Sequence, residues 1–198
     1  MLREHLNGYK VILASASPRR QQFFRDLDID FEIRLKEVEE IYPPELKEVE
    51  ITDFLAQLKA DAFVDDIGDN EIIVTSDTIV WHQDKALGKP VDFNDAFDIL
   101  SKLSASTHQV FTSVCFKSKH GSEVINEMTK VTFGSLTADE IRYYLNNHNP
   151  YDKAGAYGIQ DWIGLVAVTK IEGSYANVMG MPTDKVYEYL SKFNRKNI

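Results

Sequence analysis

The chain has 198 residues and a mass of 22.6 kDa, which suffices for one domain with a substantial hydrophobic core. Hydrophobic residues make up 43% and charged residues 27% of the sequence, a composition that excludes disordered, collagenous and disulfide-framework proteins. The net charge of −9 argues against broad contact with nucleic acid or with an anionic membrane. An anionic ligand would therefore need a local cluster of arginines and lysines.

The N-terminal segment MLREHLNGYK carries charges where a signal peptide needs an apolar stretch. No run of residues is apolar enough for a membrane span. The single cysteine, Cys115, lies in the apolar run FTSVCF, so we expect it to be buried, and it cannot form an internal disulfide. These features predict a reduced, cytoplasmic enzyme.

Strands and helices alternate in the first half of the chain. An apolar run at residues 9–14 predicts a buried strand, after which Ser17 as N-cap and Pro18 as first residue predict a helix. Alternation at residues 31–35 predicts a second strand, and apolar residues at helical spacing predict a helix over residues 48–64.

The second half predicts further elements of both kinds. The strand 71–76 is expected to end before the polar pair Asp77 and Thr78. Apolar spacing, turn signals and a capping box at Thr137–Glu140 then predict, in chain order, a helix around 96–103, strands at 108–116 and 124–133, a helix from 137 to about 148, a strand at 163–171 and a helix at 182–193. The order predicts an α/β fold, with a mixed central sheet flanked by helices. We expect residues 1–198 to form a single domain.

The common catalytic motifs are absent. The sequence has no GxxxxGK[ST], GxGxxG, HExxH or GxSxG. The five histidines lack the spacing of metal ligands and are expected at the surface or in turns. Zinc enzymology and serine hydrolysis are therefore disfavoured.

Polar residues gather where strands are expected to end. Ser15, Arg19 and Arg20 follow the first strand, and two arginines in the first turn of a helix suggest a bound anion, because that end of the helix dipole attracts negative charge. Asp77 follows a buried strand, where a carboxylate needs a cation or hydrogen bonds to offset its desolvation. A turn or capping role is the alternative for Asp77.

A third group lies in the segment 151–160. Its small residues permit close backbone approach, and Lys153 and Gln160 offer donors; a plain Gly-rich surface loop is the alternative. Lys59 and Lys89 alone would be read as solvated lysines, and Glu40 lies in an acidic run expected as exposed loop. Together these cations, carboxylates and glycines suit a phosphorylated small molecule handled with a divalent metal.

The joint pattern resembles the Maf family of nucleoside triphosphate pyrophosphatases. The matching segments are LASASPRR (13–20), VEE (38–40), LAQLKA (55–60), SDTIV (76–80), GKP (88–90), KAGAYGIQ (153–160) and NVMGMP (177–182). The resemblance implies a Maf/ITPase-like architecture with a cleft between two lobes. It also implies hydrolysis of the α–β phosphoanhydride with Mg²⁺ or Mn²⁺, commonly by a homodimer.

The resemblance also assigns roles to individual residues. It makes Asp77 the acidic centre, as metal ligand or general base, and Glu40 a second acid at the metal. Lys59 and Lys89 match lysines that meet the phosphate chain. The residues matched to substrate binding and specificity are Ser15, Arg19, Arg20, Thr78, Lys153 and Gln160.

Arg19, Thr78 and Gln160 resemble the branch that acts on dTTP and UTP, with modified pyrimidine nucleotides as further candidates. The branch acting on 7-methyl-GTP has Trp and Glu at the first and last of these positions. Asp161 and Ser113 depart from glycines that the family often has there. The alternatives are a purine nucleotide pyrophosphatase and a nucleotide-binding regulator of cell division with little turnover.

Overall fold

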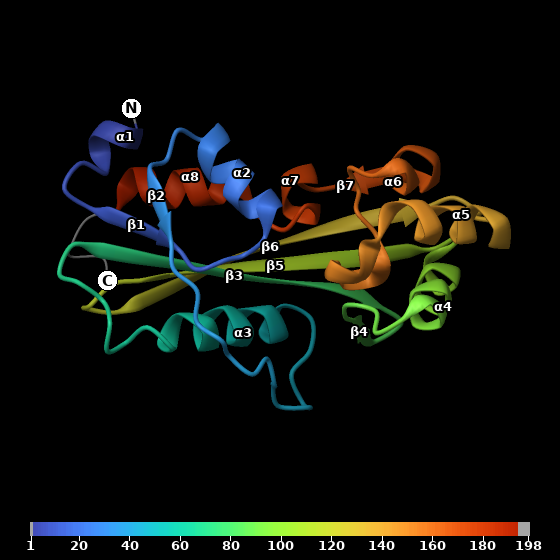
Figure 1. Ribbon diagram of the computed structural model, residues 1–198, viewed down its shortest axis with the longest axis horizontal. Helices are drawn as coiled ribbons and strands as arrows, with labels where there is room; N and C mark the ends of the chain where they lie inside the picture. Colours follow the sequence, from blue (N-terminus) through green and yellow to red (C-terminus); the bar gives the residue numbers. More distant parts are fainter. Residues whose placement is uncertain (1, 194–198) are drawn as a thin grey trace. The chain divides into compact units, whose positions relative to one another are not determined.

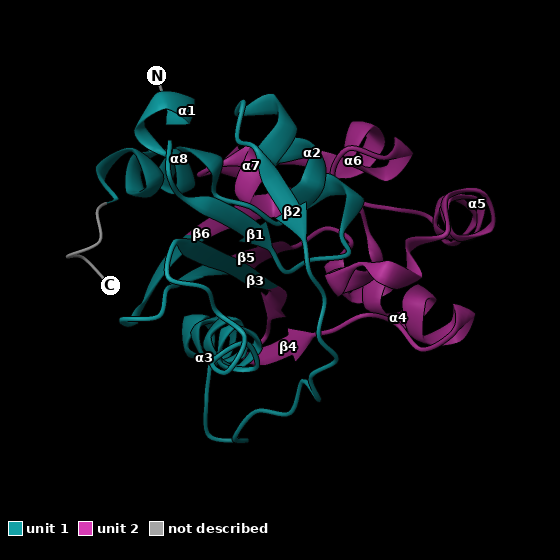
Figure 2. Cartoon of the chain, turned by 60° about the vertical axis from the view of Figure 1, so that its left-hand side comes forward, with its two compact units in different colours: residues 1–77, 112–127, 180–198 teal, residues 78–111, 128–179 magenta. Residues whose placement is uncertain are grey.

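The structure, a computed structural model, describes residues 2–193 of the chain. The chain divides into two compact units (Figure 2). Unit 1 comprises residues 1–77, 112–127 and 180–198, and unit 2 comprises residues 78–111 and 128–179. Three long strands have residues in both units: β3 (Glu71–His82), β5 (Thr107–Lys117) and β6 (Ser122–Phe133).

Unit 1 is a layered α/β structure. Its other elements are α1 (Leu2–His5), β1 (Lys10–Leu13), α2 (Pro18–Asp26), β2 (Phe31–Ile33), α3 (Val49–Asp61) and α8 (Thr183–Lys192). Strand β1 pairs in parallel with both β2 and β3. Within this unit, α2 and α8 cover one face of the strands and α3 covers the other (Figure 1).

The core of unit 1 explains why these segments fold as they do. Buried side chains such as Leu13, Phe24 and Phe116 pack together from strands and helices. Helix α2 begins where the sequence predicts, because the Ser17 side chain accepts a hydrogen bond from the Arg20 N–H and Pro18 occupies the first turn.

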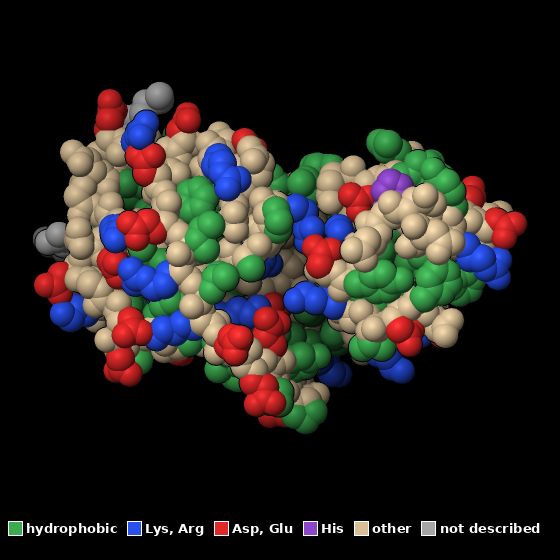
Figure 3. Space-filling model, in the orientation of Figure 1, with side chains coloured by type: hydrophobic (Ala, Val, Ile, Leu, Met, Phe, Trp, Pro, Cys, Tyr) green, Lys and Arg blue, Asp and Glu red, His purple; other side chains and the backbone are tan. Residues whose placement is uncertain are grey.

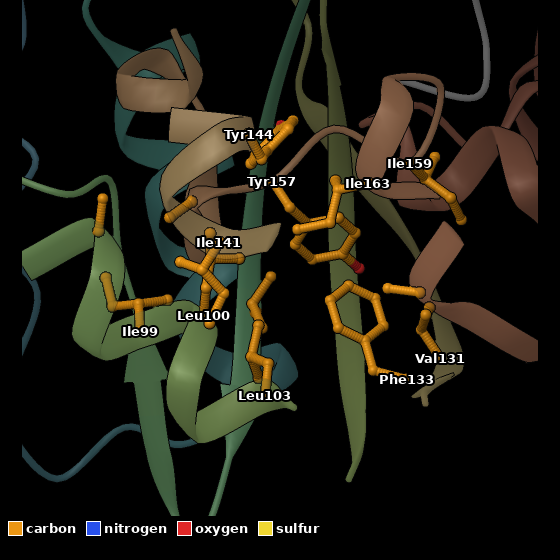
Figure 4. Packing of buried hydrophobic residues seen from close by; sticks show 14 of the residues in the cluster. Ile99, Leu100, Leu103, Val131, Phe133, Ile141, Tyr144, Tyr157, Ile159 and Ile163 are labelled. Carbon is orange, nitrogen blue, oxygen red and sulfur yellow. The ribbon is translucent and has the colours of Figure 1, made fainter. Parts of the chain in front are cut away.

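Unit 2 combines sheet segments with several helices. Its other elements are β4 (Lys85–Leu87), α4 (Phe93–Leu103), α5 (Ala138–His148), the 3₁₀ turns η1 (Pro150–Asp152) and η2 (Ala154–Ala156), α6 (Trp162–Ala167), β7 (Val168–Glu172) and α7 (Tyr175–Val178). Strand β4 is antiparallel to β3, and β7 is antiparallel to β6. Unit 2 has its own apolar core, in which Leu100, Ile141 and Phe133 lie around Tyr157 (Figure 4).

The sheet confirms the predicted fold class. Its strand order is β2-β1-β3-β5-β6-β7, with β4 attached to β3, so parallel and antiparallel pairs occur in one seven-stranded sheet. The capping box at Thr137 and Glu140 and the burial of Cys115 are also confirmed. None of the helices in residues 2–193 has the length and apolar composition needed to cross a bilayer.

The predicted strand at 163–171 is wrong in its first half. Residues Trp162–Ala167 form helix α6, and only Val168–Glu172 form a strand. Ile163 and Ala167 are buried one helical turn apart, whereas Leu165 between them is 82% exposed. A short apolar run does not by itself distinguish the two structures, and here the helical spacing of the buried positions decided.

The surface placement predicted for the histidines is wrong for two of them. His82 and His108 are buried, and His108 Nε2 lies 2.8 Å from the Tyr157 hydroxyl. Burial, reinforced by His82, lowers the pKa of His108 to about 3, so the ring is neutral at pH 7.

Candidate active site

A lysine in unit 1 joins two carboxylates from distant parts of the sequence. Lys59 Nζ, from the last turn of α3, lies 2.7 Å from Asp77 Oδ1 and 3.0 Å from Glu40 Oε1. The side chain of Asp77 is 9% exposed and that of Lys59 is 18% exposed. The ammonium group therefore offsets the cost of keeping the Asp77 carboxylate away from water.

Asp77 lies inside a strand rather than after one, which corrects the sequence prediction. The apolar runs on either side of Asp77 and Thr78 form the single strand β3, which continues to His82. The polar pair does not end the strand, since the backbone continues its pairing beyond it. The turn or capping role considered for Asp77 is thereby excluded, and its side chain is held by Lys59.

Arg20 is fixed beside this group by two backbone carbonyls. Its Nε donates to the Gly180 carbonyl at 2.9 Å, and its Nη1 donates to the Ser76 carbonyl at 2.8 Å. Burial lowers the pKa of Arg20, while the charges of Asp77 and Glu40 raise it and that of Arg19 lowers it further. The guanidinium remains charged at neutral pH and lies within electrostatic range of both carboxylates.

The remaining unit 1 residues lie at the strand-to-helix junction, as the sequence predicts. Ser15 is buried after β1, where its hydroxyl accepts a hydrogen bond from the Ser17 N–H at 3.3 Å. Arg19 lies in the first turn of α2, and that turn contains no acidic residue. Over the part of the surface formed by unit 1, acidic and basic side chains are intermixed in the view of Figure 3. Arg20 and Lys59 both interact with the carboxylates of Asp77 and Glu40.

Three of the sequence motifs meet in unit 2. The Gly155 N–H donates to the Gly88 carbonyl at 3.0 Å, which joins the segment KAGAYGIQ to GKP. Gly155 has φ of +71°, and a Cβ there would lie 2.7 Å from the Val80 side chain, so it also packs against the end of SDTIV. A larger residue would be excluded by both the backbone conformation and the contact. Lys89 is exposed beside this junction, and Thr78 is half-buried in β3.

The segment 151–160 is not a plain surface loop, which excludes the alternative considered for it. Residues 155–159 are buried, and only Asp152 and Gln160 are exposed. Lys153 Nζ lies 2.7 Å from Asp152 Oδ1 and 4.0 Å from Asp161 Oδ2. Gln160 Nε2 donates to Asp161 Oδ1 at 3.1 Å.

Sequence reasoning missed two contributors to these groups. Gly180, whose carbonyl accepts a hydrogen bond from Arg20, lies in the family segment NVMGMP. The motif marked the position, but it did not reveal that the Gly180 carbonyl orients Arg20. Tyr144 donates to Asp161 Oδ2 and accepts from the Gly158 N–H, both at 3.0 Å. In the sequence, Tyr144 is one more apolar position on a helix, and nothing there distinguishes it.

The comparison with known families decides the identity. Residues 10–193 match the family described as Maf-like protein. The chain belongs to this family.

Curated relatives cover nearly the whole of this Maf-like chain. A protein of Flavobacterium johnsoniae is 65% identical, covering 96% of this chain and 98% of the relative, and one of Flavobacterium psychrophilum is 61% identical over 96% and 97%. A protein of Christiangramia forsetii is 52% identical over 97% and 98%. All three are named dTTP/UTP pyrophosphatase. Among solved structures, the Staphylococcus aureus Ham1 protein aligns at 12% identity over 63% of this chain and 71% of its own, with a TM-score of 0.47.

The donor set of this Maf-like chain fits a magnesium ion bound together with substrate. Across residues 2–193 no three His, Cys, Asp or Glu side chains gather as a metal cluster. Asp77 and Glu40 nevertheless both contact the ammonium group of Lys59 through their carboxylate oxygens. Mg²⁺ is commonly held by one or two carboxylates plus phosphate oxygens and water, rather than by a cage of protein ligands. Two carboxylates that already hold an ammonium group match that requirement.

Proposed function

We propose that this chain hydrolyses dTTP and UTP to the nucleoside monophosphate and pyrophosphate with the help of a divalent metal, Mg²⁺ or Mn²⁺. Modified pyrimidine nucleotides are further candidate substrates. The observation that carries the proposal is the charged group of unit 1, in which Lys59 links Asp77 and Glu40 beside Arg20. The names of the curated relatives, dTTP/UTP pyrophosphatase, supply the substrate class.

In the proposed reaction a water oxygen attacks the α-phosphorus, and the bond from that phosphorus to the oxygen bridging to the β-phosphate breaks. Pyrophosphate leaves with the bridging oxygen, and the water proton passes to a base. Asp77, as the buried carboxylate, orients the water or accepts its proton. A bound Mg²⁺, held by Asp77 and Glu40, would neutralise charge on the phosphate oxygens.

The cations have separate tasks in this proposal. Lys59 and Lys89 meet the phosphate chain, and charge that develops on the departing pyrophosphate is stabilised by them. Arg20 is held by two carbonyls, so its guanidinium is already oriented before substrate binds. Arg19 and Ser15, at the N-terminal end of α2, face phosphate oxygens, where the helix dipole favours negative charge.

We assign base recognition to Thr78 and Gln160, with Lys153 as a further substrate contact. Gln160 is exposed and offers both a donor and an acceptor, which complements the edge of uracil or thymine. Both units belong to one catalytic domain in this proposal, because the family match runs through residues of each. We further propose a cytoplasmic homodimer, since nucleoside triphosphate pools lie in the cytoplasm and the family commonly forms dimers.

The test is pyrophosphate release from dTTP, UTP, CTP, GTP and 7-methyl-GTP with Mg²⁺, with Mn²⁺ and with chelator. Release from dTTP and UTP that chelator abolishes is the expected result. Activity confined to guanine nucleotides would keep the reaction and overturn the substrate. Absence of release from every nucleotide, together with thermal stabilisation by them, would indicate a nucleotide-binding regulator instead.

A further inference from the structure

Asp161 holds the amide of Gln160 in one orientation. Gln160 Nε2 lies 3.1 Å from Asp161 Oδ1. A carboxylate oxygen only accepts hydrogen bonds, so the amide atom facing it must be the nitrogen. Gln160 is exposed, and within the described residues its Oε1 has no protein hydrogen-bond partner. The oxygen and the second N–H therefore remain for a ligand.

The carboxylate is itself held from a buried position. Burial raises the pKa of Tyr144 above its usual range, so its hydroxyl stays protonated and donates to Asp161 Oδ2 at 3.0 Å. The same hydroxyl accepts from the Gly158 N–H, which ties the chain of hydrogen bonds to the backbone. Lys153 Nζ lies 4.0 Å from Asp161 Oδ2, within the range of an ion pair. Both oxygens of Asp161 thus have fixed directions.

The backbone leaves room for this arrangement at one glycine. A Cβ at Gly158 would lie 2.7 Å from Gln160 Nε2 and closer still to Asp161 Oδ2. Both side chains therefore lie over the backbone of Gly158, and a Cβ there would displace the ends of both. The absence of a side chain at Gly158 leaves room for the contact between Gln160 and Asp161.

We infer that Asp161 is a positioning residue that lets Gln160 distinguish uracil and thymine from cytosine. The inference rests on the proposed function. Uracil and thymine present an N3–H donor beside a carbonyl, whereas cytosine presents an N3 acceptor beside an amino donor. An amide that is free to rotate by 180° can pair with either arrangement of donor and acceptor on the base. An amide held through its nitrogen presents its oxygen and its second N–H in fixed positions, so it can pair with only one arrangement. Asp161 therefore confers selectivity against cytosine without touching the base.

The test compares kcat/KM for UTP and CTP in the wild type and in Asp161→Asn. Asn is nearly isosteric and offers both a donor and an acceptor, so either orientation of the Gln160 amide becomes possible. We expect the ratio of UTP to CTP to fall roughly tenfold, mainly through KM, with kcat for UTP little changed. Asp161→Ala, which removes the acceptor, should change the ratio in the same direction, and melting temperatures report the folding of each variant.

Two further variants separate positioning from a general effect of charge or stability. Asp152→Asn removes a carboxylate from the same Lys153 ammonium and leaves the bond between Asp161 and Gln160 in place, so it should keep the ratio. In a Gln160→Ala background the ratio is already low, and adding Asp161→Asn should not lower it further, because the two residues act through one interaction.

An unchanged ratio in Asp161→Asn would overturn the inference, as would an equal fall in Asp152→Asn or additive effects in the double variant. A wild type active on UTP and CTP alike would overturn it too, while leaving the proposed pyrophosphatase activity standing. A wild type that releases pyrophosphate from neither UTP nor dTTP would overturn the proposed function, and the inference with it.

Discussion

The ammonium group of Lys59 lies 2.7 Å from the carboxylate of Asp77, which joins a helix to the middle of a buried strand in unit 1. The contact explains how a charged residue occupies a buried position in this strand. It also places a cation at the carboxylate on which the proposed reaction depends.

Asp77→Asn should reduce the rate of pyrophosphate release from dTTP by roughly a hundredfold or more. The carboxamide accepts a proton and binds a cation much less well than the carboxylate does. The isosteric side chain still accepts a hydrogen bond from Lys59, so we expect the fold to persist. Steady-state kinetics and thermal melting, measured on the same preparation, separate the two effects.

The matched control for that variant is Glu71→Gln, another carboxylate on β3 held by a cation. Glu71 Oε1 and Oε2 each lie 2.8 Å from the Arg34 guanidinium, away from the proposed reacting groups. Glu71→Gln should keep the turnover number. Equal loss of activity in both variants would show that Asp77 acts through stability alone.

Glu40→Gln should affect the metal requirement more than turnover at saturation. Glu40 is 46% exposed and contacts Lys59 from a loop, so its loss should disturb the fold little. We expect the Mg²⁺ concentration for half-maximal activity to rise roughly tenfold, since one of two carboxylate ligands is lost. A metal titration at fixed UTP measures this, and an unchanged curve would remove Glu40 from the proposed metal site.

The ion pair of Glu71 and Arg34 predicts a pH-dependent part of the stability. The hydrogen bond from Arg34 lowers the pKa of Glu71 from 4.5 to about 2. Because the folded pKa lies below the unfolded one, the stabilisation is present above pH 4.5 and is lost as the pH falls toward 2. Glu71→Gln should cost about 1 kcal/mol at pH 7 and less near pH 3. Urea unfolding of the wild type and Glu71→Gln at both pH values measures this difference in the free energy of unfolding. An equal difference at pH 7 and pH 3 would contradict the prediction.

Ser113 is part of a buried polar network, and its removal should lower stability without changing activity. Its hydroxyl donates to Asp53 Oδ1 at 2.6 Å and lies 2.7 Å from Thr52 Oγ1. Ser113→Ala leaves those partners short of a hydrogen bond, at a cost of about 1–2 kcal/mol. Denaturant unfolding measures the loss. A neutral result would show that the hydrogen bonds of Ser113 make no net contribution to stability.

Much of the fold follows from local sequence signals. Ser17 and Pro18 predict the start of α2, and Thr137 and Glu140 predict that of α5, because capping satisfies backbone groups within a few residues. The helix 162–167 could not be predicted this way. Its apolar run fits a strand equally well, and only packing against the core of unit 2 selects the helical turn that buries Ile163 and Ala167.

The chemistry available to this protein can be read from its amino-acid sequence: the family motifs, the acidic balance, and the arginines, lysines and carboxylates proposed to handle phosphate. Which of these residues meet depends on the folded structure. Asp77 is held by Lys59 and Glu40 shares the same ammonium, while Gln160 is held by Asp161 and, through it, by Tyr144. The physical reason is that ion pairs and hydrogen bonds act over a few ångströms in space, and separation along the chain does not reveal which groups folding brings within that range.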